Sequence, residues 1–217
     1  MRLLTLGALL LAATTPAAAQ RQLELTPFWT AFIPIAPVGT NVEGSVVRQQ
    51  SALGAGGRLT AWGNNKVALD FSLTYELTLA SMYAGGQLGD VDSHLIEGSV
   101  RLLYEIKPHP AGTSFFVAGG AAFNAHRGAA YRSLWGRRGS SFGDEASGTP
   151  WGPVFGAGFR YRVTRDLLVR IEAEDYIYSF SGAAQMAPGG YPSHLQSDLV
   201  FAVGASYVLL GRGGFIR

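Results

Sequence analysis

Residues 67–77, with the sequence VALDFSLTYEL, alternate strictly between apolar and polar side chains. Successive side chains of a β-strand point to opposite faces, so a period of two predicts a strand with one apolar and one polar side. The apolar side consists of Val67, Leu69, Phe71, Leu73, Tyr75 and Leu77.

Other parts of the chain show the same kind of alternation. We predict further strands at 22–33, 56–63, 95–106, 114–124, 151–163, 167–178 and 198–209. The facing of the segment 56–63 stays open, because a shift of one residue exchanges its two sides. Short turns are expected at 63–66, 107–112 and 164–166, and long loops at 34–55, 78–94, 125–150 and 179–197.

Short and long connections thus alternate along the predicted strands. This alternation is typical of a bacterial outer-membrane barrel, which has short turns in the periplasm and long loops outside the cell. The predicted fold class is therefore all-β: an eight-stranded antiparallel transmembrane β-barrel with short periplasmic turns and long extracellular loops.

The alternation alone does not say which face lies inside, since a lipocalin-like soluble barrel alternates with its apolar face inward. Two features favour lipid on the outside. The non-apolar faces carry small residues that suit a narrow lumen: Ala118, Gly120, Ala122, Gly156 and Gly158. Aromatic residues near strand ends suit the membrane–water interfaces: Trp29, Trp62, Tyr75, Tyr104, Trp151, Tyr161, Tyr178 and Tyr207.

The first residues, MRLLTLGALLLAATTPAAAQ, fit a secretory signal peptide with a charged start, an apolar middle and small residues before the cleavage site. We expect a signal peptide at 1–19, cleaved on export through the Sec route, and a barrel domain at 20–217. Charged residues are 15% of the chain, against roughly 25% in ordinary soluble domains. The net charge of +2 gives no reason to expect nucleic acid, and the absence of cysteine excludes disulfides and thiol nucleophiles.

Three segments resemble a known family. LELTPFWTAFIP, GGRLTAWGNNKVALDFSLTYE and DLVFAVGASYVL are similar to the first, second-to-third and last strands of small outer-membrane β-barrel domain proteins. That family includes opacity-type and OmpX-like barrels and the OmpA transmembrane domain. The resemblance implies the fold rather than a function. Members commonly end on an aromatic residue that the assembly machinery recognises, whereas GRGGFIR follows Leu210 here. The signal is then expected around Tyr207 to Leu209 or at Phe215.

Charged residues on the predicted inner faces form a candidate lumen network. Its members are Asp70, Glu76, Glu97, Arg101, Arg160, Arg170, Glu172 and Glu174, with Glu105 also facing inward. Arg58 joins them if the segment 56–63, whose facing stays open, turns that side to the lumen. Pairing around the turn 164–166 would set Gly158 opposite Glu172 and Gly156 opposite Glu174, which leaves room for both carboxylates. We expect Arg101, Arg160 and Arg170 to neutralise Glu97, Glu172 and Glu174 in a static network, because eight strands enclose little more than side chains. The alternative is a switchable plug that opens a narrow path.

The predicted loop 125–150 is rich in arginine. Arg127, Arg132, Arg137 and Arg138 interleave with Tyr131 and Trp135, with Asp144 and Glu145 nearby. Such a run can contact the phosphates of lipopolysaccharide. The plainer interpretation is a solvated loop whose charges are balanced locally.

The sequence indicates no enzyme, no cofactor and no metal site. Glu172 and Glu174 share a face, but nothing places a nucleophile beside them, and the histidines show no metal-ligand or catalytic spacing. The expected function is non-enzymatic, with a structural or surface-interaction role. A small channel for solutes or hydrophobic compounds and an outer-membrane lipid-modifying enzyme are the alternatives. Expected partners are outer-membrane lipid, lipopolysaccharide, periplasmic chaperones and the barrel-assembly machinery, and the chain is expected to be monomeric.

Overall fold

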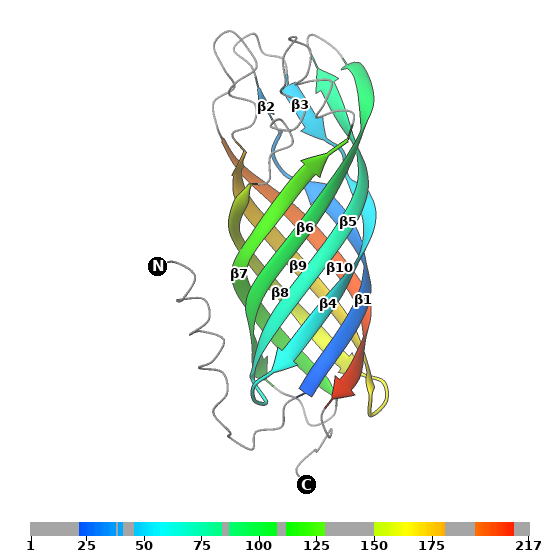
Figure 1. Ribbon diagram of the computed structural model, residues 1–217, viewed down its shortest axis with the longest axis vertical. Coiled ribbons are helices and arrows are strands. Elements are labelled where there is room, and N and C mark those ends of the chain that lie inside the picture. Colours follow the sequence, from blue (N-terminus) through cyan, green and yellow to red (C-terminus); the bar gives the residue numbers. More distant parts are fainter. Residues whose placement is uncertain are drawn as a thin grey trace, which may run out of the picture.

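The computed structural model describes residues 22–37, 39–40, 46–83, 87–107, 112–128, 150–180 and 194–210. The long strands are β1 (Gln22–Pro34), β4 (Ala52–Trp62), β5 (Val67–Tyr83), β6 (Gln87–Lys107), β7 (Thr113–Arg127), β8 (Trp151–Arg162), β9 (Leu167–Phe180) and β10 (His194–Leu210). Two short strands, β2 (Gly39–Thr40) and β3 (Val46–Gln49), lie at one end of the molecule (Figure 1). The predicted all-β class is confirmed.

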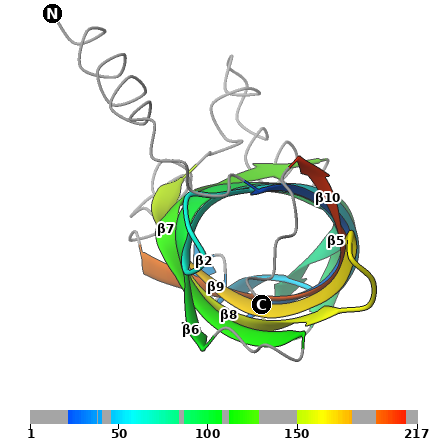
Figure 2. The same cartoon turned by 90° about the horizontal axis from the view of Figure 1, so that it is seen from below.

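The long strands form a closed ring (Figure 2). Each pairs antiparallel with its neighbour in the order β1-β4-β5-β6-β7-β8-β9-β10, and β10 pairs back onto β1 with Leu23 opposite Leu210. Closure leaves no free sheet edge among these strands, so their backbone groups are paired without water. This satisfies the main requirement for a sheet that crosses a membrane. The described residues contain no helix of the length and apolarity needed for a membrane span.

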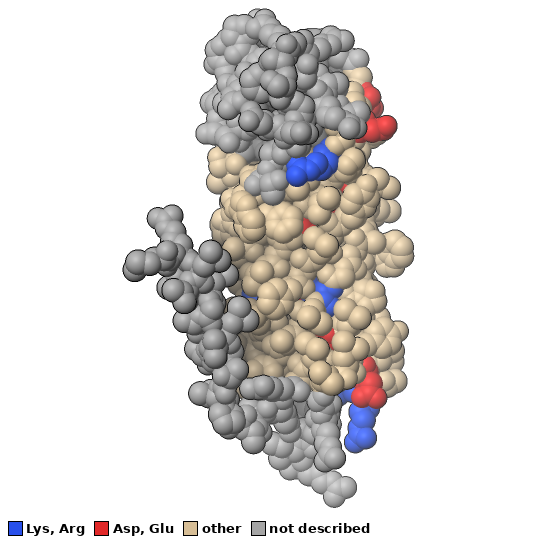
Figure 3. Space-filling model, viewed as in Figure 1, with Lys and Arg blue, Asp and Glu red and all other residues tan. Residues whose placement is uncertain are grey.

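The outer wall of the ring is apolar. Trp29 is 75% exposed, Trp151 69% and Leu73 56%. The space-filling view shows a largely uncharged wall, with Lys, Arg, Asp and Glu atoms mainly toward its two ends (Figure 3). An exposed apolar surface of this extent is unfavourable in water and indicates contact with lipid. The expected facing, with lipid outside, is confirmed.

The strands at the end that carries β3 are longer than the sequence predicted. β5 continues to Tyr83 and β6 begins at Gln87, so most of the expected loop 78–94 is paired strand. The remainder, 84–86, lies outside the described residues. β4 likewise begins at Ala52 rather than at 56, and β10 at His194 rather than at 198.

Two of the aromatic residues expected at the membrane interfaces lie inside the barrel instead. Trp62 is 7% exposed and Tyr178 is 3% exposed. Trp62 packs against a lumen arginine, and the hydroxyl of Tyr178 is hydrogen-bonded, so both rings fill the interior. Sequence alone could not predict this, because an aromatic residue suits either environment at the end of a strand.

Candidate functional site in the barrel lumen

An arginine–carboxylate cluster crosses the middle of the lumen. It consists of Arg58 from β4, Asp70 from β5, Arg101 from β6, and Arg170, Glu172 and Glu174 from β9. We call these six residues the central cluster. Each is at most 2% exposed. The three guanidinium groups face three carboxylates, so the cluster is neutral when all six groups are charged.

The contacts of the central cluster join opposite walls. Arg101 Nη1 donates to Glu172 Oε1 at 2.8 Å, and Arg170 Nη2 lies 2.8 Å from Glu172 Oε2 and 3.1 Å from Asp70 Oδ2. Arg58 binds both Glu172 and Glu174. Glu172 therefore accepts hydrogen bonds from all three arginines. Arginine suits this task because its planar fork donates along several directions at once.

Glycines on β8 give the cluster its space. Gly158 lies opposite Glu172 and Gly156 opposite Glu174, the register that the sequence predicted. A Cβ at Gly156 would stand 3.0 Å from Glu172 Oε1 and 3.1 Å from Arg101 Nη1. Any larger side chain there would displace the ion pairs.

Aromatic rings complete the packing of the arginines. The guanidinium carbon of Arg58 lies 4.8 Å from the ring centre of Phe28, and that of Arg170 lies 4.6 Å from the ring centre of Phe116. These cation–π contacts are stronger where water is excluded. The cluster therefore fills the lumen with both charge and ring surface.

A second group of ion pairs lies toward the turn end of the barrel. Arg160 Nη1 donates to Glu105 Oε1 at 2.7 Å, and Nη2 of the same residue donates to Glu24. The guanidinium of Arg160 lies 4.6 Å from the ring centre of Trp62. This group occupies the lumen between the central cluster and the turn end.

Three carboxylates lie on the other side of the central cluster, toward the end that carries β3. They belong to Glu76, Glu97 and Asp198 and are at most 2% exposed. Glu76 accepts a hydrogen bond of 3.0 Å from the Thr30 hydroxyl, and Asp198 accepts one from the Tyr178 hydroxyl. Within the described part of the chain, none of the three forms an ion pair with lysine or arginine. The expected neutralisation of Glu97 by an arginine is therefore absent.

The buried imidazole of His126 extends this polar region. Its Nδ1 lies 3.1 Å from Gln49 Oε1, and its Nε2 lies 3.0 Å from the Tyr178 hydroxyl. Residue 126 lies in the stretch 125–150 that the sequence predicted as a loop. The longer β7 instead places His126 inside, at 1% exposure.

The facing of Arg58 stayed open in the sequence, and Glu24 was not among the expected lumen residues. Pairing of β4 with β5 around the turn 63–66 sets Arg58 opposite Ser72, on the polar inner face. The alternation within 67–77 could therefore have fixed the facing of Arg58. Glu24 stands between Leu23 and Leu25, so the same alternation could have placed it on the inner face.

Of the four arginines expected to contact lipopolysaccharide, only Arg127 lies within the described residues. It is at the end of β7 opposite His94, and its Nη1 donates to the backbone oxygen of His126 at 3.1 Å. Arg132, Arg137 and Arg138 lie outside the described residues.

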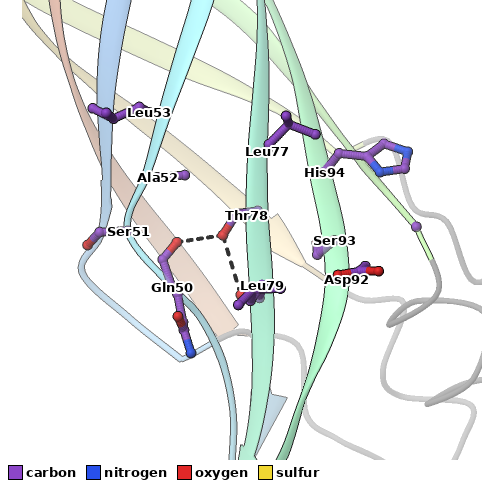
Figure 4. Close-up of a pocket in the computed structure, with 11 residues that line it drawn as sticks. Gln50, Ser51, Ala52, Leu53, Leu77, Thr78, Leu79, Asp92, Ser93 and His94 are labelled. Carbon is purple, nitrogen blue, oxygen red and sulfur yellow. Dashed lines mark hydrogen bonds between the residues drawn. The ribbon is translucent and has the colours of Figure 1, made fainter.

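A pocket of about 770 Å³ lies in the barrel wall near the end that carries β3. It is lined from neighbouring strands by Leu53, Leu77 and Leu79 and by polar groups that include Gln50 and His94 (Figure 4). The Thr78 hydroxyl donates to the Gln50 backbone oxygen at 2.6 Å, which ties the corner between β3 and β4 to β5. The lining offers apolar and polar contacts side by side.

In the central cluster and around Arg160, carboxylates and guanidinium groups balance each other's charge. No three His, Cys, Asp or Glu side chains of the described strands are placed to hold a metal among themselves. The side chains of the central cluster cross the lumen in mutual contact.

The family model described as outer membrane protein beta-barrel domain matches residues 5–208 of the chain. Among solved structures, the outer membrane protein OprG of Pseudomonas aeruginosa matches with a TM-score of 0.60 and 13% identity, covering 89% of this chain and 97% of that one. AlkL, solved in lipid bilayers, matches with a TM-score of 0.58 and 15% identity, covering 91% and 94%. A search of curated proteins found no match. At these identities the structural likeness extends to the fold alone.

Proposed function

The chain belongs to the outer membrane protein beta-barrel domain family, and we propose that it is a non-enzymatic member with a closed lumen and a structural or surface-interaction role. The observation that carries this proposal is the central cluster. Six buried charged side chains from four strands meet within hydrogen-bond distance across the lumen. A barrel of this size has little interior beyond its side chains.

The energetics of the cluster support a static plug. Opening a water path would separate guanidinium groups from carboxylates that are at most 2% exposed. Breaking one buried pair costs about 3–5 kcal/mol, because the remaining charge is left uncompensated. Several pairs share atoms here, so a path through the cluster would break more than one of them. The closed arrangement is therefore strongly favoured.

With a closed lumen, the protein would act through contacts of its outer wall and of its outer end. The apolar wall suits outer-membrane lipid, and Arg127, with Arg132, Arg137 and Arg138, suits the phosphates of lipopolysaccharide. We propose in addition a monomer that is exported through the Sec route with a cleaved signal peptide. Periplasmic chaperones and the barrel-assembly machinery would be its partners during biogenesis.

Conductance in a planar lipid bilayer tests the closed lumen. We expect the purified wild type to show no steady conductance, whereas Glu172→Ala removes the carboxylate shared by three arginines and admits water and ions. Asp166→Ala, in the exposed turn after β8, is the control and should stay silent. Steady conductance of the wild type that neither Glu172→Ala nor Arg101→Ala changes would refute the plug and support the channel alternative.

The wall pocket favours a second candidate function, the binding of a small hydrophobic or amphiphilic compound on its way across the membrane. Leu77 and Leu79 offer apolar surface beside the polar group of Gln50. Uptake of such a compound by cells that carry the protein should fall for Leu77→Ser. Leu195→Ser is the matched control, because Leu195 is 68% exposed on β10 and Leu77 is 67% exposed. Equal uptake by the two variants would remove this candidate.

A further inference from the structure

The lumen toward the β3 end is acidic without a compensating cation in the described residues. Every carboxylate of the central cluster contacts at least one guanidinium, and Arg160 contacts the carboxylates of Glu24 and Glu105. Glu76, Glu97 and Asp198 contact none, although Glu76 and Glu97 are 0% exposed and Asp198 is 2% exposed. Buried carboxylates are ordinarily paired or bound to a metal, so this region requires a partner.

Hydrogen-bond acceptors without donors converge in the same place. Both carboxylate oxygens of Glu97, Oε2 of Glu76 and Oδ1 of Asn124 are buried with no hydrogen-bond partner. Asn124 on β7 lies directly opposite Glu97 on β6, and both side chains are buried in the lumen. Asn124 is 2% exposed and carries no charge. Its unpartnered oxygen is thus separate evidence for a missing partner.

The chemistry of these atoms identifies that partner. All are oxygen acceptors, which a hard cation prefers. A proton on Glu97 could be donated to Glu76 Oε2 or Asn124 Oδ1, but this single donor would leave two of the four oxygens unpartnered. A lone water could donate two hydrogen bonds but would leave the charges in place. A cation with its bound water supplies both positive charge and donors.

We propose that Glu76, Glu97 and Asn124 bind a hard divalent cation of the Mg²⁺ or Ca²⁺ type. No three His, Cys, Asp or Glu side chains in the described strands can hold a metal among themselves. The ion therefore keeps much of its water shell and uses two carboxylates and one amide oxygen. Mg²⁺ commonly binds in this way, through one or two carboxylates and several waters. Asp198 adds negative charge nearby.

The position of the site sets the route of entry. Glu76 follows Tyr75, and Thr30, which bonds Glu76, follows Trp29; both aromatic side chains are exposed on the outer wall. Aromatic rings at this end of the strands mark the outer membrane interface. The site therefore lies near the outer water, whereas the central cluster separates it from the periplasmic side. We infer that the cation enters from outside the cell.

Purified barrel in detergent, stripped with a chelator, provides the test. Mg²⁺ or Ca²⁺ should raise its unfolding temperature more than NaCl of equal ionic strength, because a ligand of the folded state stabilises that state. Glu97→Gln should weaken the apparent affinity by about tenfold or more, since the number of charged ligands sets cation affinity. Asp92→Asn, an exposed acid on the same strand, is the matched control and should respond like the wild type.

A second measurement covers the case in which Glu97→Gln does not fold. Tb³⁺, which substitutes for Ca²⁺, should luminesce when the wild type is excited through buried tyrosines such as Tyr178, and Mg²⁺ or Ca²⁺ should displace it. Asn124→Leu should weaken this signal. An absence of any divalent effect on the wild type would overturn the proposal. An equal effect on the wild type and Glu97→Gln, lost in Asp92→Asn, would place the ion on the outer rim and overturn it too. None of these results depends on whether the lumen conducts.

Discussion

Replacement of Glu172 by glutamine changes the centre of the lumen with little change in volume. The carboxylate accepts from Arg101 through Oε1 at 2.8 Å and from Arg170 through Oε2 at 2.8 Å, and it also binds Arg58. Glutamine keeps one oxygen but turns the other into an amino group that faces guanidinium donors. The central cluster then holds three positive charges against the two of Asp70 and Glu174.

We expect Glu172→Gln to lower the free energy of unfolding by about 3–5 kcal/mol, the usual cost of leaving a buried charge unpaired. With a dependence on urea of roughly 1–3 kcal/mol per molar, the unfolding midpoint should fall by at least about 1 M. Asp166→Asn removes an exposed carboxylate from a turn and should change the free energy by no more than about 0.5 kcal/mol.

The assay is urea unfolding of the purified barrel in detergent, followed by heat-modifiable gel mobility and tryptophan fluorescence. The double variant Arg170→Met, Glu172→Met removes one charge of each sign and restores the balance. It should be more stable than Glu172→Met alone, because replacing a whole buried pair by apolar groups is far less costly than breaking it. A loss below about 1 kcal/mol in Glu172→Gln, or simple additivity in the double variant, would refute the ion-pair account.

Three further outcomes follow from the structure. Leu73→Arg should lower the folded fraction on heat-modifiable gels, since arginine on the lipid face near the midplane costs roughly 2–4 kcal/mol; a silent change would mean that this face does not contact lipid. Gly156→Val should impair folding by displacing the central cluster, whereas Gly57→Val, whose Cβ meets nothing within 4 Å, should fold normally in the same assay. In single-tryptophan variants, brominated lipid should quench Trp29, which is 75% exposed, and spare Trp62, which is 7% exposed; quenching of Trp62 would contradict its place in the lumen.

The sequence predicted the strands best where one side meets lipid and the other meets the lumen. The segment 67–77 alternates fully because both constraints act on it. The alternation fades in QLGDVDSH, at the start of β6, although this segment is paired strand. Asp90 and Asp92 are exposed there, on the side of β6 that carries the exposed Val100 and Leu102 farther along, so the outward side is no longer apolar. Periodicity of hydrophobicity cannot reveal such an extension.

The sequence predicted which side chains face the lumen but not which side chains they contact there. Alternation places Arg101 and Glu97 on the same inner face, and the expectation was that arginine neutralises Glu97. In the structure Arg101 contacts Glu172 of β9, across the barrel. Such contacts depend on the tilt and stagger of the whole ring, which relate strands far apart in the chain. Neighbours across one short turn, such as Gly158 and Glu172, depend only on local register and could be predicted.

The distribution of the central cluster along the chain bears on how the barrel is made. Arg58, Asp70 and Arg101 lie in the first half of the chain, whereas Arg170, Glu172 and Glu174 lie together on β9. A hairpin of β4 and β5 alone would carry Arg58 against Asp70 and Glu76, which leaves excess negative charge. Each unpaired charge at the centre of a bilayer costs about 2.5–3.5 kcal/mol or more. Insertion of separate hairpins is therefore disfavoured, and the charges favour a route in which β9 approaches β4 before the strands reach the hydrocarbon.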